Sequence, residues 1–343
     1  MKNASLCYIE RGGKYLMLLR NKKPDDPNEG KWIGVGGKLE PGESPADCAR
    51  REIREETGLT ALDLISFGRV YFKSDVWEEE IMHLFLVTDF EGEVTDCDEG
   101  ELHWIDKNEV FDLPLWDGDR IFLKYLLDGR QFDEMTLDYH GERLCGCRVD
   151  SVEKELLDVF NEDGSPAGYV ASREYVHWKG LWHATVHIWI AGENDGKPSL
   201  LLQLRAADKR LYPSCWDISA AGHIPSGEAA LNGAMRELAE ELGIHVSPDE
   251  FAYLGTMKMT YDDDDDGGYH DREHCRIYLL RRQVDLSGLT LQASEVERVM
   301  WMTLEEIMES LENGGLNHCL HKEELAFIRP VILADDWKGT GFN

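Results

Sequence analysis

The feature that most constrains this chain is a pattern of glycines and acids that occurs twice. The first copy, residues 37–59, reads GKLEPGESPADCARREIREETGL, and the second, residues 222–244, reads GHIPSGEAALNGAMRELAEELGI. Each copy holds a glutamate soon after its first glycine, then an Arg-Glu pair, a Glu-Glu pair and a closing glycine. A repeat with such constant spacing indicates a tandem duplication in which each half of the chain carries its own site.

Each copy predicts a helix with acids on one face. In the first copy, Ser44-Pro45 is a favourable helix start and Gly58 a favourable end. A helix between them places the three later glutamates at i, i+3 and i+4, and therefore on one face. Carboxylates are hard oxygen ligands that suit Mg²⁺ or Mn²⁺, the cations that pair with phosphate oxygens. An exposed helix with Arg-Glu pairs would explain one copy, but not two with the same spacing.

Composition limits the partners and the location. The chain has 343 residues, enough for two domains, and a formal charge of −31, which repels a nucleic-acid backbone. A small phosphorylated substrate is compatible with this charge because divalent metals supply positive charge. No apolar run is long enough for a membrane helix, and the N-terminus turns polar too early for a signal peptide, so we expect a cytosolic protein without a membrane partner. The sequence leaves the oligomeric state open.

The duplication extends beyond the two boxes. Apolar strands expected at 5–9 and 15–20 are matched by 182–190 and 200–205, and a tryptophan precedes each box. We place the domain boundary near Asp150, which gives domains of 1–150 and 151–343 and an α/β fold class. The acidic run 262–266 is interpreted as a solvated loop, with an extra cation site as the alternative.

Both boxes resemble the signature of the Nudix hydrolases, G-x5-E-x7-R-E-U-x-E-E-x-G-U, at every defined position. The resemblance implies two α/β/α sandwiches around mixed β-sheets, and metal-dependent hydrolysis of a nucleoside diphosphate linked to another group. It implies that the arginine of each box orients the carboxylates, and that its first glycine and glutamate shape the metal loop. It also implies that the three later glutamates bind metal, and that the last two of these, the Glu-Glu pair, act in catalysis as well. These residues are Gly37, Glu43, Arg51, Glu52, Glu55 and Glu56 in the first box, and Gly222, Glu228, Arg236, Glu237, Glu240 and Glu241 in the second.

The general base varies among Nudix enzymes and can lie outside the box. Glu99 is the candidate in the first half, and Glu295 holds the matching place in the second. The alternative for both is an exposed loop acid.

The first half resembles the MutT-type oxidised-nucleotide phosphatases over about residues 3–140. The resemblance rests on the lead-in KWIGVGGK, which ends at Lys38, and on Leu115-Trp116-Asp117-Gly118-Asp119. It implies that Lys38, Trp116 and Asp119 bind substrate, with Trp116 stacking on a purine and Asp119 bonding its edge; a core role is the alternative for Trp116. The implied reaction converts 8-oxo-dGTP to the monophosphate and pyrophosphate. Relatives that read 8-oxoguanine with an asparagine place it where this chain has Ile33, which leaves base selectivity open.

The second half resembles the Nudix branch related to isopentenyl diphosphate isomerase, over about residues 153–330. The resemblance implies a metal held by His183, His223 and Glu273, with a further histidine near His177 and an acid at Asp271. The isomerases need a catalytic cysteine where this chain has Ala221, and they do not keep the hydrolase box intact. We therefore expect a hydrolase of a second diphosphate substrate, with an isomerase-like enzyme or a ligand-binding module as alternatives.

Overall fold

The computed structural model describes residues 1–23, 26–263 and 268–334. The chain folds into two compact units: Met1–Leu156 with Tyr169–Tyr175, and Leu157–Gly168 with the chain from Val176 onward. The boundary expected near Asp150 lies shortly before Leu156, where the chain first passes from the first unit to the second. Part of the acidic run interpreted as a solvated loop, Asp264 to Asp266, lies outside the described residues. Among the helices that are described, none has both the length and the apolar character needed to cross a membrane.

The first unit is built on one mixed sheet. Its strands are β1 (Lys2–Arg11), β2 (Lys14–Arg20), β3 (Trp32–Ile33), β5 (Ile65–Ser74), β6 (Glu80–Val87), β8 (Gly100–Asp106), β9 (Glu134–His140), β10 (Arg143–Val149) and β11 (Val152–Glu153). Their order is β11-β10-β9-β5-β6-β1-β2-β3, and β8 pairs with β2. The pairs β1–β6 and β5–β9 are parallel, whereas β1–β2 and β5–β6 are antiparallel. A separate ribbon joins β4 (Thr60–Ala61) and β7 (Phe90–Glu91).

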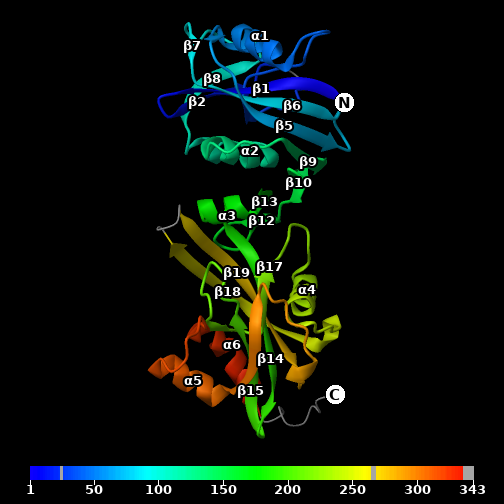
Figure 1. Cartoon of the computed structure of the whole chain (residues 1–343), viewed down its shortest axis with the longest axis vertical. Helices are drawn as coiled ribbons and strands as arrows, with labels where there is room; N and C mark the ends of the chain where they lie inside the picture. The colour runs from blue at the N-terminus through cyan, green and yellow to red at the C-terminus, as the bar shows by residue number, and fades with distance from the viewer. Residues whose placement is uncertain (24–25, 264–267, 335–343) are drawn as a thin grey trace. The chain divides into compact units, whose positions relative to one another are not determined.

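Helices cover both faces of this sheet (Figure 1). The box helix α1 (Pro45–Thr57) buries Ala49 and Ile53 against β1 and β2. On the other face, α2 (Asp117–Leu127) brings the Phe122 ring to 6.1 Å from that of Tyr8. Between β8 and α2 lies one turn of 3₁₀-helix, η1 (Val110–Asp112). The predicted α/β/α sandwich is confirmed for this unit.

The second unit has the same layers. Its strands are β12 (Leu156–Phe160), β13 (Pro166–Ser172), β14 (Trp182–Asn194), β15 (Lys197–Arg205), β16 (Trp216–Asp217), β17 (Ala220–His223), β18 (Phe251–Asp263), β19 (Tyr269–Arg281) and β20 (Val296–Thr303). Leu156 of β12 and residues 169–172 of β13 are assigned to the first unit. Its helices are α3 (Arg173–Lys179), which begins in the first unit, α4 (Ala230–Leu242), α5 (Leu304–Asn313) and α6 (Lys322–Ile332), with 3₁₀ turns η2 (Pro248–Glu250) and η3 (Leu286–Gly288). The strand β14 lies between β19, with which it is parallel, and β15, with which it is antiparallel.

Alternate residues of β14 face the two helical layers. Val186 and Ile188 pack with the box helix α4, whereas Trp189 packs in the core cluster formed with α5 and α6. Figure 1 shows α4 and the α5–α6 pair on opposite faces of this sheet.

Strand register shows which residues of β1 in the first unit correspond to which residues of β14 in the second. Val35 lies two residues before Gly37 and bridges to Cys7, and Ala220 lies two residues before Gly222 and pairs with Ile188. Cys7 and Ile188 therefore hold matching positions, and the next residues, Tyr8 and Trp189, match as well.

Candidate active sites

The box helix of the first unit begins and ends at the predicted residues. The Ser44 hydroxyl accepts a hydrogen bond from the Asp47 N–H, and Pro45 opens α1. Gly58 takes the left-handed conformation (φ 76°), and its N–H donates to the Arg54 carbonyl. Glycine adopts this conformation without steric cost, so it stops the helix at this point. The glutamates of the box therefore fall on the last turns of α1.

Arg51 holds three carboxylates of the first box together. Its Nε donates to Glu43 Oε1 at 2.9 Å, and its Nη1 donates to Glu52 Oε1 at 2.6 Å and to Glu55 Oε2 at 3.2 Å. Its Nη2 donates to the Lys38 carbonyl at 3.1 Å. The hydrogen bonds from Arg51 lower the pKa of Glu43 to about 2, so this carboxylate stays ionised. Arg51 thus fixes the loop and the helix relative to one another.

Arg236 repeats this arrangement in the second box. Its Nη1 donates to Glu237 Oε1 at 2.7 Å and to Glu240 Oε2 at 3.2 Å. Its Nη2 donates to Glu228 Oε2 at 3.1 Å and to the His223 carbonyl at 3.0 Å. The residue types, the atoms and the distances agree closely with those around Arg51, so both boxes build the same local geometry.

The first glycine of each box leaves room for a carboxylate. A Cβ on Gly37 would lie 2.4 Å from Glu52 Oε1, and a Cβ on Gly222 would lie 2.0 Å from Glu237 Oε1. Only glycine allows the backbone of the loop to approach these side chains so closely. Carboxylates gathered in this way are a hard-oxygen donor set, so the two boxes fit the divalent metal that the sequence predicts.

The last glutamate of each box is buried. Glu56 is 7% exposed and Glu241 5%. Burial raises the pKa of Glu56 to about 8, with Glu99 and Glu52 adding to the rise, while the Gly36 N–H donates to its Oε2 at 2.8 Å and opposes it. Burial also raises the pKa of Glu241 well above its usual value. A buried carboxyl that is crowded by other acids gains most from a nearby cation.

The two candidate general bases lie in salt bridges. Glu99 pairs with Arg20 and Lys23, and Glu295 pairs with Lys209. Burial raises the pKa of Glu99, but Lys23 and Arg20 outweigh it, so the net pKa lies below the usual value. Each acid also raises the pKa of the buried glutamate in its own unit, which indicates that each lies beside its box.

The predicted base-recognition residues lie at the start of α2. Trp116 is the N-cap, is half-buried, and donates from Nε1 to Asn28 Oδ1 at 2.8 Å. The Lys31 ammonium lies 4.7 Å from the centre of its ring. Asp119 is 8% exposed, and burial raises the pKa of its carboxyl to about 7. Lys38 is exposed in the loop before α1.

In the second unit, three histidines converge with two acids. The rings of His183 and His223 stack at 5.1 Å, and His177 Nε2 lies 3.4 Å from His223 Nε2. His183 Nε2 lies 3.5 Å from Asp271 Oδ1 and 4.0 Å from Glu273 Oε1. The structure therefore brings His183, His223 and Glu273 together. Imidazole and carboxylate groups at such distances form a donor set suited to a divalent cation.

Several residues of these sites were not singled out from the sequence. They are Arg20, Lys23 and Gly36 in the first unit, and Gln203, which donates to Glu241 Oε2 at 3.3 Å, Arg205, Lys209 and Asp217 in the second. Arg20 and Arg205 lie 185 residues apart, as the two boxes do. Extending the repeat upstream of each box would have found this pair.

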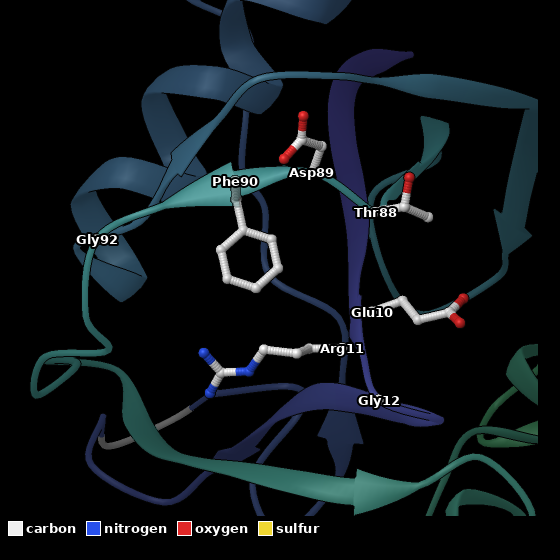
Figure 2. Close-up of a pocket in the computed structure, with 7 residues that line it drawn as sticks. All are labelled: Glu10, Arg11, Gly12, Thr88, Asp89, Phe90 and Gly92. Carbon is white, nitrogen blue, oxygen red and sulfur yellow. The ribbon is translucent and has the colours of Figure 1, made fainter.

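A cavity of about 370 Å³ lies away from the predicted site of the first unit. It is lined by Glu10, Arg11, Gly12, Thr88, Asp89, Phe90 and Gly92. Figure 2 shows the Arg11 guanidinium under the Phe90 ring, 5.7 Å from its centre. The cavity lies at the end of β1 opposite to Ser5, whose N–H donates to the Gly37 carbonyl. None of the predicted site residues lines it.

Comparison with known proteins finds a family match in both halves of the chain. The NUDIX domain model matches residues 2–126 and 181–321. An uncharacterized Nudix hydrolase of Clostridium acetobutylicum is 38% identical over 162 residues, which is 47% of this chain and 76% of that protein. An oxidized purine nucleoside triphosphate hydrolase of Danio rerio is 35% identical over 133 residues, 38% of this chain and 83% of that protein. The crystal structure of a MutT protein from Bacillus halodurans shares 30% identity, covers 44% of this chain and 98% of its own, and superposes with a TM-score of 0.39.

Two regions of the chain match the family model, and each contains one complete box. The chain therefore belongs to the Nudix hydrolase family and carries two Nudix domains in tandem.

Proposed function

We propose that the first domain hydrolyses oxidised purine nucleoside triphosphates, with 8-oxo-dGTP as substrate and the monophosphate and pyrophosphate as products. The observation that carries the proposal is the pairing of Trp116 with Asp119 at the start of α2, where a half-buried indole precedes a buried carboxyl whose pKa is about 7. A flat indole face favours stacking on a base. A carboxyl that titrates near neutrality can donate or accept a hydrogen bond at the base edge. The similarity to the oxidized purine nucleoside triphosphate hydrolase of Danio rerio supports this choice.

The chemistry is assigned to the box. When bound, Mg²⁺ or Mn²⁺ supplies positive charge for the diphosphate and favours ionisation of water. Glu52, Glu55 and Glu56 would hold the metal, in positions that Arg51 and the space at Gly37 define. Glu99 would accept a proton from water, a role that is supported by its pairing with Lys23 and Arg20, because the two cations lower its pKa.

The test is a comparison of Trp116→Ala with His321→Ala. His321 is the exposed N-cap of α6, at the place in the second domain that Trp116 holds in the first. Losing base stacking costs about 1–3 kcal/mol, so Trp116→Ala should raise KM for 8-oxo-dGTP by about 10-fold or more in a pyrophosphate-release assay, and His321→Ala should not. An unchanged KM in Trp116→Ala, or no pyrophosphate from the wild-type protein, would contradict the proposal.

We propose that the second domain hydrolyses a different diphosphate. It has a complete box around Arg236, and the cluster of His177, His183, His223, Asp271 and Glu273 would hold a further divalent cation. This imidazole–carboxylate group has no counterpart in the predicted site residues of the first domain. Ala221 argues against isomerase chemistry, because the thiol that the isomerases use is missing at that position.

A screen of diphosphates with wild type and Glu241→Gln tests this proposal. We expect a phosphate-containing product whose release is lost in Glu241→Gln and retained in Glu56→Gln. Isomerisation of isopentenyl diphosphate by the wild-type protein would favour the isomerase-like alternative. Tight binding of a diphosphate without turnover would favour a ligand-binding module.

A further inference from the structure

A second group of metal-ligating side chains lies in the second domain beside the histidine cluster. One ligand atom each from His187, Glu273 and Cys275 lies within 4.8 Å of the others. Cys275 is fully buried, His187 is 9% exposed, and the Cys275 thiol donates to Glu273 Oε2 at 3.4 Å. Thiolate, imidazole and carboxylate together form a donor set typical of Zn²⁺.

Strand register explains why these side chains meet. In the parallel pair β14–β19, His183 is opposite Glu273 and Thr185 is opposite Cys275. Side chains alternate along a strand, so His187, two residues beyond Thr185, lies on the same face as Cys275. Thr185 is 2% exposed, and its hydroxyl has no hydrogen-bond partner of normal geometry among the described residues. That hydroxyl is therefore available to donate to a thiolate on the neighbouring strand.

A buried acid from another layer orients His187. Glu324 on α6 is 1% exposed, and its Oε1 lies 3.1 Å from His187 Nδ1 and accepts from Trp189 Nε1 at 2.7 Å. A carboxylate on Nδ1 orients the ring and leaves Nε2 as the nitrogen that can face a metal ion. Metal-binding histidines usually have such a carboxylate on the second ring nitrogen. This contact is independent of the three clustered ligand atoms and supports the same conclusion.

The first domain lacks this group. By the register that matches Cys7 with Ile188, the counterpart of His187 is Leu6, and the counterpart of Cys275 is Met82. Neither residue supplies an imidazole or a thiolate, although Glu80 stands where Glu273 does. The group is thus a property of the second domain and not of the shared fold.

We propose that His187, Cys275 and Glu273 bind a thiophilic divalent metal ion such as Zn²⁺, with Glu324 as the positioning residue for His187. Glu273 is shared between the two groups, because its Oε2 faces Cys275 and its Oε1 faces His183 of the histidine cluster. Three protein ligands leave a fourth position open, as in catalytic zinc sites. Ala221, half-buried and opposite His187 in the β14–β17 pair, places this site beside the strand that leads into the second box. The site does not depend on the proposed hydrolase substrates, because hard Mg²⁺ has little preference for a thiolate.

Cobalt binding to the full-length protein tests the proposal. Co²⁺ bound by a thiolate gives a near-ultraviolet charge-transfer band, which nitrogen and oxygen ligands do not give. Among the clusters found in the described residues, only the one with Cys275 contains sulfur, so the histidine cluster cannot produce the band. We expect a saturable band in wild type that is lost in Cys275→Ser and kept in Cys145→Ser, an exposed cysteine that serves as the control. An unchanged band in Cys275→Ser would overturn the assignment.

Two further measurements keep the test decisive if Cys275→Ser folds poorly. The ¹¹³Cd NMR spectrum of the wild-type protein should show a resonance shifted by one sulfur ligand, and its absence would reject the site. Glu324→Gln should keep the cobalt band but weaken Co²⁺ affinity by about 10-fold or more, the usual effect of removing a carboxylate that orients a ligating histidine. An affinity that is unchanged in folded Glu324→Gln would show that Glu324 has only a structural role.

Discussion

The last helix of each domain, α2 or α6, carries a buried acid near its start. The two acids differ in their surroundings, because burial dominates around one and hydrogen-bond donors surround the other. Asp119 follows the N-cap of α2 by three residues, and Glu324 follows the N-cap of α6 by three. Burial leaves Asp119 with a raised pKa, whereas Glu324 is bonded to Trp189 and His187. Trp189 holds the strand position that Tyr8 holds in the first domain.

This difference separates the parts of the Nudix fold that repeat from those that vary. The box helices α1 and α4, with Arg51 and Arg236, are nearly identical in their contacts. The opposite face of the sheet is where the domains diverge. In the first domain that face holds the buried carboxyl of Asp119, and in the second it holds the hydrogen-bonded group of Glu324, His187 and Trp189. Under the proposed function, the box on the common face would carry out hydrolysis, and the opposite face would contribute to substrate choice.

The largest expected effect is domain-selective loss of turnover. Glu56→Gln should reduce pyrophosphate release from 8-oxo-dGTP by about 1000-fold, because the box loses a negative charge that would hold the metal. Glu241→Gln should leave that reaction unchanged and remove the activity of the second domain. Steady-state assays with Mg²⁺ on both variants measure this. If neither substitution affects any turnover, the assignment of both metal sites is wrong.

The two buried acids of the last helices should respond oppositely to neutralisation. An acid with a raised folded pKa costs stability as pH rises from its unfolded pKa, 3.8 for Asp119, to its folded value of about 7. Asp119→Asn removes that cost, so its free energy of unfolding should exceed that of wild type by on the order of 4 kcal/mol at pH 8, with the gap closing toward pH 4.

Glu324→Gln should instead destabilise by about 3 kcal/mol at pH 8, since it removes the charged acceptor of His187 and Trp189. Calorimetric unfolding of both variants across this pH range is the measurement. Equal signs at pH 8 would remove the contrast between the two faces.

A methyl group at the first glycine of either box tests whether the close approach of the loop to the glutamate side chain matters equally in both boxes. Gly37→Ala and Gly222→Ala should each lower Mg²⁺ affinity by about tenfold, because the new Cβ displaces Glu52 or Glu237. The controls are Gly146→Ala and Gly288→Ala, where an added Cβ meets no atom closer than 3.4 Å. Metal titration of turnover in each domain measures the effect. If both box variants need no more Mg²⁺ than wild type, the loop can move to accommodate the methyl group without disturbing the glutamate.

The smallest expected effect concerns the start of the box helices. Ser44 caps α1 with its side chain, whereas Ala229 at the same place before α4 makes no side-chain cap. Ser44→Ala should therefore destabilise the first domain by about 1 kcal/mol, and Ala229→Ser should stabilise the second by a similar amount. Thermal unfolding distinguishes the two. A loss of stability in Ala229→Ser would mean that its backbone does not allow a side-chain cap.

Much of the fold could be predicted because its signals are local. Ser44, Pro45 and Gly58 mark the ends of α1 through capping chemistry. The α/β/α layers also follow from the order of the apolar strands and from the repeat. The single 3₁₀ turn η1 shows the limit of such signals, since one turn of helix depends on its surroundings more than on its own sequence.

The candidate sites likewise have features that follow from the local sequence and features that depend on the folded chain. The spacing of the box places its three later glutamates on one helix face, but it does not show that Glu56 is buried against Gly36 while Glu55 is exposed. The salt bridges of Glu99 with Arg20 and Lys23 join segments far apart in sequence. Such contacts depend on strand register, which no local pattern encodes.

The sequence alone determined that the chain has two metal-and-diphosphate boxes, because the spacing of charges on a helix depends only on helical geometry. The tertiary structure decided what lies across the sheet from each box. Glu324 and His187 are 137 residues apart, and Cys275 joins them from a third element. Their meeting depends on the pairing of β14 with β19 and on the packing of α6, which are properties of the folded chain and not of any single segment.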